Sequence, residues 1–209
     1  MKKHVKWMAV SWTIGLLIAC SNTTKMTRTY VDDTRIGTPV EDVLIIAIID
    51  EAEIRKLFET YFMKRLNAVG VEAIISADVL PIRTDTKLQK EAILKVIDGH
   101  GSDTVAITHL VGLEESEVFS RSIRRSPQYY TGYYRFYNYA WDYVHAPTVY
   151  GEHIQISLET RLYDVKTESL IWVGESKTMD PKTTGQAIGQ VVDMVMNEMK
   201  KNRLLPESK

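Results

Sequence analysis

The chain has 209 residues, enough for one domain with short appendages but too few for two full-sized catalytic domains. Hydrophobic residues make up 44% and charged residues 25%, which excludes a wholly disordered chain and a protein with several membrane spans. Because 26 Lys and Arg residues face 27 Asp and Glu residues, there is no net basic charge of the kind that binds nucleic acid, and we expect no nucleic acid partner.

Residues 1–19 have the pattern of a secretory signal peptide. Lysines open the segment, and the apolar stretch that follows is shorter than the roughly 20 residues that span a bilayer. The stretch ends in Leu-Ile-Ala-Cys20, which resembles the lipobox of bacterial lipoproteins. This resemblance implies that Cys20, the single cysteine, carries the lipid. It also implies that Ser21, not being Asp, directs the protein to the outer membrane, facing the periplasm.

The segment after Cys20 predicts a tether. It is rich in Ser, Thr, Asp and Lys, shows no apolar period, and ends near Gly37 and Pro39. We therefore expect a lipidated cysteine and tether over 20–40, and a folded periplasmic α/β domain over 41–205.

The first part of this domain predicts strands that alternate with helices. The apolar run Val43–Ile49 suits a strand buried on both faces, and 71–77 suits a second strand. Between them a helix should begin at Asp50 and end at Gly70. Its apolar stripe consists of Ile54, Leu57, Phe58, Tyr61, Phe62, Leu66 and Val69, with Arg55 and Glu59 among the charged residues placed mostly outside it.

A second helix is expected over 85–98, closed by Gly99, and a third strand over 103–113. Strands connected by helices of this length form βαβ units, so we expect these three strands to be parallel.

The last third of the chain predicts an antiparallel hairpin followed by a helix. The strands are 152–165 and 170–178, joined by four residues. Even-numbered residues of the first strand, such as Leu162, should face the core, and odd-numbered ones should meet water or helix edges. Ile171 should face the core, with Trp172 covering the opposite side or a sheet edge. The last helix should open at Asp180-Pro181, with an apolar stripe of Ile188, Val191, Val192, Val195, Met196 and Met199.

The predicted fold class is therefore α/β, with a mixed β-sheet of parallel βαβαβ followed by an antiparallel hairpin, packed with helices in two or three layers. The pattern from "ADVLP" through "LETRLYDVKTESLIWVGESKTMDP" resembles a family of periplasmic lipoproteins of Gram-negative bacteria. More distantly, it is similar to the α/β domain of the curli-secretion lipoprotein and to the amino-terminal domain of TolB. This resemblance implies a protein-interaction or envelope-assembly module without an inherited active site.

The sequence contains no recognisable catalytic or metal-binding motif, so we expect no enzyme activity, no cofactor and no metal. Four histidines remain after processing, and none has the spacing of a zinc site: His100, His109, His145 and His153. The carboxylates Glu114, Glu115 and Glu117 follow the third strand, with a basic cluster of Arg121, Arg124 and Arg125 after them. An envelope enzyme acting on peptidoglycan or lipid, using Glu114, Glu115 or His109, is the alternative.

A Tyr-rich insert over 114–151 is the unusual feature of the sequence. If it forms a strand, its odd-numbered aromatic residues share one face. Three interpretations remain open: a loop without a defined role, a binding surface, or a contact with the membrane interface. The candidate binding residues are Tyr133, Tyr137, Tyr139, Trp141 and Tyr143.

The expected function is that of an outer-membrane-anchored lipoprotein of the cell envelope. Its partners would be the membrane, through the amino-terminal lipid, and an envelope protein or further copies of the same chain. An oligomeric subunit of a secretion complex is the second alternative.

Overall fold

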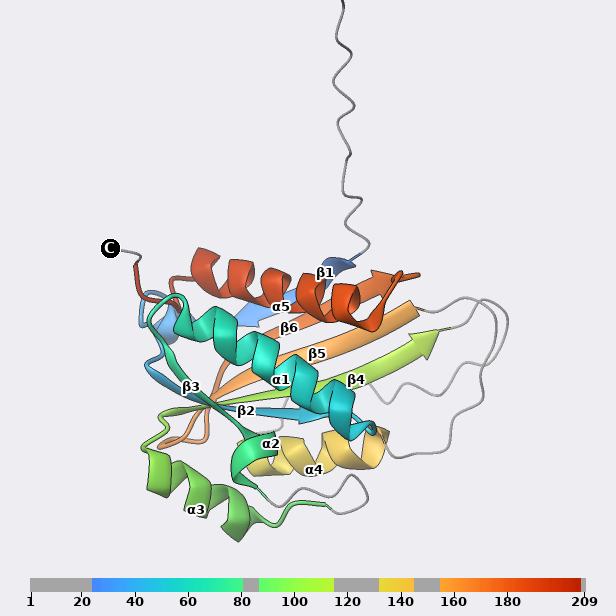
Figure 1. The fold of residues 1–209 in the computed structure, drawn as a ribbon. Helices are drawn as coiled ribbons and strands as arrows, with labels where there is room; N and C mark the ends of the chain where they lie inside the picture. Colours follow the sequence, from blue (N-terminus) through green and yellow to red (C-terminus); the bar gives the residue numbers. More distant parts are fainter. Residues whose placement is uncertain (1–23, 81–86, 115–131, 145–154, 208–209) are drawn as a thin grey trace, which may run out of the picture.

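The protein, described here as a computed structural model over residues 24–80, 87–114, 132–144 and 155–207, forms a six-stranded mixed sheet with helices on both faces (Figure 1). The strand order is β1-β6-β5-β4-β2-β3. The α/β fold class is confirmed. In chain order the elements are β1 (Thr24–Val31), the 3-10 helix η1 (Asp33–Arg35), β2 (Asp42–Ile48), α1 (Ala52–Asn67), β3 (Glu72–Ile75), α2 (Ser76–Val79), α3 (Lys90–His100), β4 (Thr104–Glu114), α4 (Tyr133–Val144), β5 (Gln155–Asp164), β6 (Leu170–Met179) and α5 (Thr184–Lys201).

Both predicted pairing patterns are confirmed. Strand β2 pairs in parallel with β3 on one side and with β4 on the other, so its continuous apolar run lies inside the sheet. Strands β4, β5 and β6 pair antiparallel, and the hairpin joins the last two.

Strand β1 was not predicted. It pairs antiparallel with β6 and forms one edge of the sheet, so the tether predicted over 20–40 is wrong for residues 24–31. Five of its eight residues are exposed, and an exposed, polar strand contains no apolar run by which it could be recognised in the sequence. Its first residue is fixed by side-chain hydrogen bonds, since Thr24 Oγ1 lies 2.8 Å from Thr178 Oγ1 and donates to Gln190 Oε1 at 2.8 Å.

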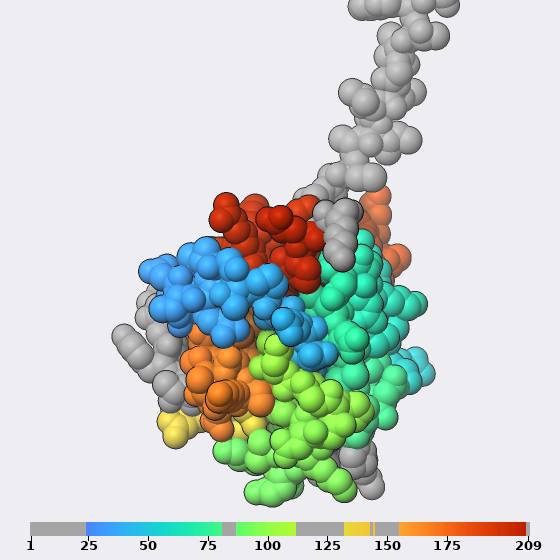
Figure 2. Space-filling view, turned by 90° about the vertical axis from the view of Figure 1, so that its left-hand side faces the viewer, coloured from blue at the N-terminus to red at the C-terminus, as the bar shows by residue number. Residues whose placement is uncertain are grey.

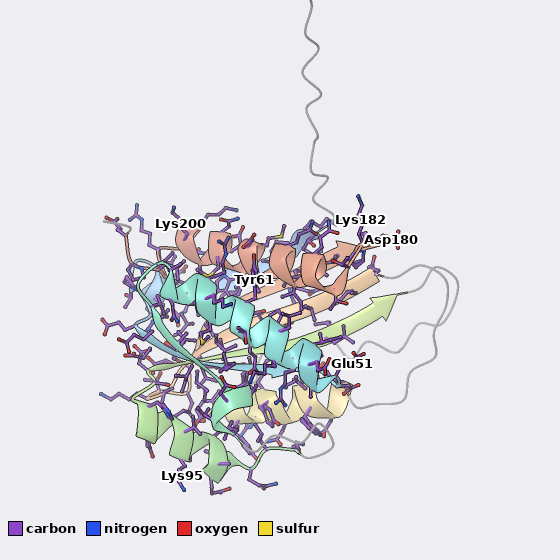
Figure 3. All side chains as sticks on the ribbon, in the orientation of Figure 1. Glu51, Tyr61, Lys95, Asp180, Lys182 and Lys200 are labelled. Carbon is purple, nitrogen blue, oxygen red and sulfur yellow. The ribbon has the colours of Figure 1, made fainter. Side chains whose placement is uncertain are left out.

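Helices α1 and α5 cover one face of the sheet and build the first core with β2, β5 and β6 (Figures 1 and 3). The predicted stripe of α5 is confirmed, because all six of its residues are buried. The stripe of α1 is only partly correct: Leu57 is 48% exposed, whereas Arg55 and Glu59 are buried. Glu59 joins α1 to β2 and α2, because its carboxylate accepts hydrogen bonds from the backbone N–H of Ala47 and Ala77 and from Ser76 Oγ.

Helices α3 and α4 cover the opposite face over β2, β4 and β5, so the domain has three layers. These helices and strands enclose a second core, whose buried residues are Leu44, Ile46, Ile48, Leu80, Leu88, Ile93, Val96, Ile97, Val105, Ile107, Tyr133, Phe136, Tyr137, Ala140, Val144 and Tyr163. No helix among the described residues is long and apolar enough to cross a membrane.

Several predicted helix ends are displaced by a few residues. Helix α3 ends at His100, and the left-handed cap is Gly101, which has a φ of +70°, rather than Gly99. Helix α5 begins at Thr183, whose hydroxyl accepts from the N–H of Gln186, rather than at Asp180. For α1 the first cap position is Glu51, not Asp50.

Trp172 lies on the same face as Leu162, contrary to the prediction. The two residues are cross-strand partners, and the register of β5 with β6 shifts by one residue next to them. This bulge places both Ile171 and Trp172 in the first core. Gly174 follows on the same face and leaves room for the indole ring, since a Cβ there would lie 2.2 Å from Trp172 Cη2.

Candidate functional site

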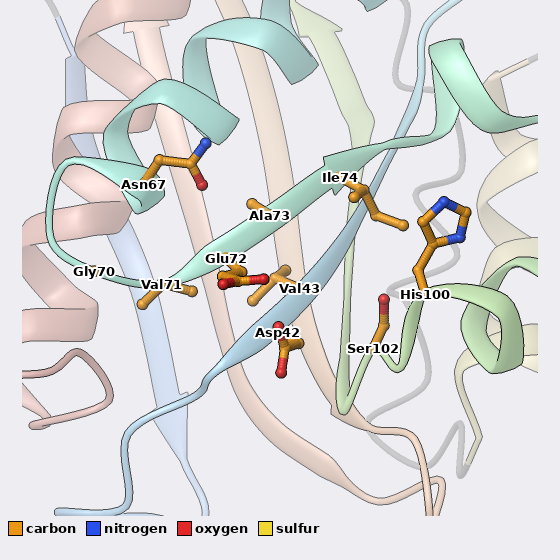
Figure 4. Close-up of a pocket in the computed structure, with 10 residues that line it drawn as sticks. All are labelled: Asp42, Val43, Asn67, Gly70, Val71, Glu72, Ala73, Ile74, His100 and Ser102. Atoms are coloured by element: carbon orange, nitrogen blue, oxygen red, sulfur yellow. The ribbon is translucent and has the colours of Figure 1, made fainter.

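A groove with a volume of about 520 Å³ lies at the β3 edge of the sheet (Figure 4). It lies between the carboxyl ends of two helices, because α1 ends at Asn67 and α3 ends at His100. We call it the β3 groove. Its lining residues are Asp42, Val43, Asn67, Gly70, Val71, Glu72, Ala73, Ile74, His100 and Ser102.

The β3 groove is acidic. Figure 4 shows Asp42 and Glu72 near its centre, and no described lining residue is Lys or Arg. Asp103 adds a third carboxylate beside them, since its Oδ1 accepts from the N–H of Asp42 at 3.3 Å. The ends of α1 and α3 contribute further negative potential, because the carboxyl end of a helix carries a partial negative charge. The groove therefore favours a cationic ligand.

The backbone of β3 offers hydrogen bonds along the same groove. The N–H of Glu72 donates to the carbonyl of Glu41 at 2.9 Å, on the β2 side. In parallel pairing alternate residues bond to the same neighbour, so the N–H and C=O of Ala73 point away from β2. Because β3 is an edge strand, an extended segment could hydrogen-bond to it there.

His100 supplies a polar ring at one side of the groove. Its Nδ1 lies 3.0 Å from the carbonyl oxygen of Val96, and because a carbonyl oxygen only accepts, Nδ1 carries the hydrogen. This bond fixes the ring at the end of α3 and leaves Nε2 for other interactions.

The predicted aromatic binding surface is largely part of the core. Tyr133 and Tyr137 are each 1% exposed and lie on helix α4, not on a strand, so the prediction that they form a binding surface is wrong. Tyr137 accepts a hydrogen bond from the N–H of Leu88 at 3.0 Å. Burial raises the pKa of Tyr137 to about 12.

The other aromatic candidates on α4 occupy intermediate positions. Tyr139 and Trp141 are partly buried against the second core, with Trp141 6.1 Å from the Tyr137 ring. Tyr143 belongs to α4, and its side chain lies outside the described part. A binding role for Tyr139, Trp141 and Tyr143 stays a prediction.

Of the residues considered for catalysis, His109 is inaccessible in this structure. It is 1% exposed in β4, with the Phe136 ring 5.1 Å away and the Tyr139 ring 6.1 Å away. Burial, together with the nearby Arg161 guanidinium, lowers the pKa of His109 to about 3. The ring is therefore neutral near pH 7 and too deeply buried to meet a substrate.

The remaining candidates for chemistry are not brought together by the described structure. Glu114 is the last residue of β4. The others lie outside the described residues: Glu115, Glu117, Arg121, Arg124, Arg125, His145 and His153, as does the predicted lipidation site Cys20. The described residues contain no group of three or more His, Cys, Asp or Glu side chains that could hold a metal ion.

The burial of His109 predicts an acid-sensitive fold. Between pH 7 and pH 5 the wild-type chain should lose about 2 kcal/mol more stability than a His109→Gln variant. The folded pKa lies below the ordinary value of 6.5, so only the unfolded chain takes up this proton as the pH falls. The contribution of neutral His109 to stability is complete above about pH 6.5. It is lost as the pH falls toward about 3, at about 1.4 kcal/mol per pH unit.

Urea unfolding at the two pH values measures this difference. His100→Gln is the matched control, because His100 is exposed, and it should respond to pH as the wild type does. Equal pH responses of the wild type and His109→Gln would contradict the prediction.

A buried charge cluster lies on the sheet face that carries α4. Glu159 is fully buried, and its carboxylate accepts from Arg161 Nε at 2.7 Å and from Arg28 Nη2 at 3.0 Å. Arg161 also donates to Tyr163 OH at 3.3 Å, and its guanidinium carbon lies 4.0 Å from the Phe136 ring centroid. Glu159 and Arg161 were expected to meet water or helix edges; both are buried, and Arg161 packs against Phe136 of α4, so the helix alternative holds and the water alternative does not.

Comparisons with known proteins identify no family. No protein-family model matches the chain, and no curated protein matches it. Similar solved structures include a PelC dodecamer from Paraburkholderia phytofirmans, with 9% identity, a TM-score of 0.45, and coverage of 86% of this chain and 97% of that chain. A PelC variant dodecamer from the same organism has 7% identity, a TM-score of 0.43, and coverage of 83% and 94%.

A third similar structure is lipoprotein GNA1162 from Neisseria meningitidis. It has 13% identity, a TM-score of 0.40, and coverage of 77% of this chain and 99% of that chain. The expected resemblance to periplasmic lipoproteins, and the more distant one to the curli-secretion lipoprotein and to TolB, stay predictions. At these identities and TM-scores no function or assembly is carried over to this chain.

Proposed function

We propose that this protein is a lipid-anchored envelope lipoprotein that binds a partner protein by accepting an extended basic segment in the β3 groove. The observation that carries this proposal is that β3 is an edge strand of the described sheet and that Ala73 on this edge shares one hollow with the carboxylates of Asp42 and Glu72. Backbone pairing would supply affinity, and the carboxylates would select for Lys or Arg.

The anchoring half of the proposal rests on the sequence. The charged and apolar leader ends in the chain's single cysteine, in a lipobox-like segment, which supports lipidation of Cys20 and attachment to the outer membrane. The protein would then act in the periplasm, close to that membrane.

Catalysis is not part of the proposed function. Burial removes His109 from contact with substrate. An oligomeric subunit remains the competing possibility, because the segment that pairs with β3 could come from a second copy.

Binding of a basic peptide tests the groove. The probe is a fluorescent octapeptide of alternating Lys and Thr, titrated against the full mature chain in a non-ionic detergent. We expect binding that a Glu72→Lys variant weakens at least tenfold, about 1.4 kcal/mol, because a like charge then faces the peptide. The matched octapeptide of Glu and Thr should not bind.

Glu53→Lys is the control for net charge. Glu53 is exposed in the first turn of α1, about 20 Å along the helix from Asn67, so the same charge change there should leave the dissociation constant within about twofold. Equal losses in both variants, or no binding of the Lys peptide, would contradict the proposal. A photo-crosslink from position 67 to another copy in cells would favour the oligomeric subunit.

A further inference from the structure

The predicted lipidation site lies close in sequence to the first strand, so lipidation would restrict how the folded domain can lie on the membrane. This step rests on the lipid anchoring of the proposed function. Only three residues lie between Cys20 and Thr24, where β1 begins, and the four residue-to-residue steps span at most about 14 Å. Lipidation of Cys20 therefore holds the start of β1 within that distance of the bilayer.

The start of β1 is firmly joined to the body, so the body is held with it. Thr24 is buried and hydrogen-bonded to Thr178 of β6 and Gln190 of α5. Figure 2 shows β1, in blue, at the surface beside α5, in red. No long flexible tether stands between the lipid and the sheet, and the edge carrying β1 must lie near the headgroups.

The residues around this point have the composition of a membrane-contacting surface. Lys25 and Lys177 are cross-strand partners, so they share one face of the sheet. Met179 lies two residues farther along β6 on the same face and is 45% exposed. Tyr30 of β1 also lies on this face and is 55% exposed. We call Lys25, Tyr30, Lys177 and Met179 the anchor-side face.

The described helices on this side pack on β2, β4 and β5, whereas α1 and α5 cover the opposite face. Nearby charges are mixed but favour cations next to the anchor. Lys182 and Asp180 are both exposed just beyond β6, at the end of the sheet where β1 begins (Figures 1 and 3). Glu175 on the same face is paired with Arg28 at 3.4 Å.

We propose that the anchor-side face lies against the membrane, with Lys25 and Lys177 at anionic headgroups and Tyr30 and Met179 at the interface. Electrostatic attraction acts over about 8 Å at physiological salt, and the lipid keeps Lys25 close enough to use it. Tyrosine favours the headgroup level, and the exposed thioether side chain adds apolar contact. Because the lipid already holds the protein on the membrane, this contact is in effect intramolecular. Individually weak interactions are therefore enough to maintain it.

The β3 groove lies at the other edge of the sheet from the predicted anchor. The β3 edge lies five strand spacings from β1 in the sheet, about 24 Å. A partner could therefore reach the groove while the opposite edge of the sheet stays on the membrane.

Site-specific fluorescence on the full lipidated protein tests the contact. Met179→Cys and, separately, Lys95→Cys carry an environment-sensitive fluorophore in vesicles of phosphatidylglycerol and phosphatidylcholine that contain a lipid-borne quencher. Lys95 is exposed on α3, which Figure 3 shows far from the start of β1. We expect a blue shift and quenching at position 179 and neither at position 95.

Charge removal tests the cause of the contact. The combined Lys25→Gln and Lys177→Gln changes should shift the equilibrium between docked and free body about fivefold per lysine, about 25-fold together. Lys95→Gln with Lys200→Gln is the matched control, since both lysines are exposed elsewhere, and it should leave quenching unchanged. Equal quenching in vesicles of phosphatidylcholine alone would overturn the electrostatic part.

The outcomes separate this inference from the proposed function. A protein that stays on the vesicles through its lipid but shows no quenching at position 179 overturns the membrane contact and leaves the proposed function standing. If the wild type and a Cys20→Ala variant are both recovered free of membranes from cells, the lipid anchoring itself is wrong.

Discussion

Truncation of Tyr137 to Ala should lower the free energy of unfolding by about 3 to 5 kcal/mol, the loss typical of a large aromatic side chain removed from a core. Tyr137 is 1% exposed, and its hydroxyl accepts the N–H of Leu88. Its ring lies 6.2 Å from that of Tyr134 in a stacked arrangement and 6.1 Å from that of Trp141. The substitution leaves a cavity and removes the hydrogen-bond partner of a buried N–H.

Urea unfolding of the full chain measures this loss. Tyr30→Ala is the matched control, because the same side chain there is 55% exposed, and it should change stability by no more than about 0.5 kcal/mol. A loss below about 1 kcal/mol for Tyr137→Ala would mean that α4 does not pack on the sheet as described.

Replacement of Glu159 by Leu should cost about 3 to 5 kcal/mol, because it leaves the guanidinium of Arg161 buried without its carboxylate. The Arg161 side chain is 4% exposed, so water cannot replace the lost partner. Arg28, the other partner of Glu159, is 42% exposed and can be solvated. Changing Arg161 to Met in the same chain should recover most of the loss, since a buried ion pair can be replaced by apolar groups of similar volume at little cost.

A double-mutant cycle on Glu159 and Arg161 measures the coupling. The exposed ion pair of Lys56 and Asp78 provides the comparison, since its side chains are 59% and 52% exposed. Lys56→Met should change stability by less than about 1 kcal/mol. The prediction is wrong if the Glu159→Leu variant is as stable as Lys56→Met.

The sequence was informative wherever a strand or helix has one apolar pattern. The run Val43–Ile49 could be placed inside the sheet, and the stripe of α5 could be listed residue by residue, because burial there follows directly from composition. The parallel and antiparallel halves followed from the lengths of the connections.

The errors arise where burial depends on what covers a face. Period-two alternation identifies the polar side of β5, but it cannot tell whether a helix lies over that side, so water and helix edges both stayed open for Glu159 and Arg161. Likewise, β1 is an edge strand whose exposed residues give no apolar signal. A one-residue bulge moved Trp172 to the other face, and no composition rule predicts its position.

The signal for α4 was present but was read with the wrong period. Its fully buried residues are spaced by three and four, as one face of a helix requires: Tyr133, Phe136, Tyr137, Ala140 and Val144. The odd-numbered tyrosines were considered only as one face of a possible strand. The β3 groove could not have been predicted from sequence, because its residues come from five separate segments of the chain that only the fold brings together.

The pairing of β1 with β6 also sets an order of events during folding. The two strands lie about 150 residues apart in sequence, since Thr24 pairs with Thr178, so β1 has no described neighbour until the end of the chain is available. Closing so large a loop is slow compared with forming the hairpin of β5 and β6. The strand made first is thus the last to be seated. A lipid added to a nascent Cys20 would already be in the membrane when it docks, and the final step of folding would take place at the bilayer surface.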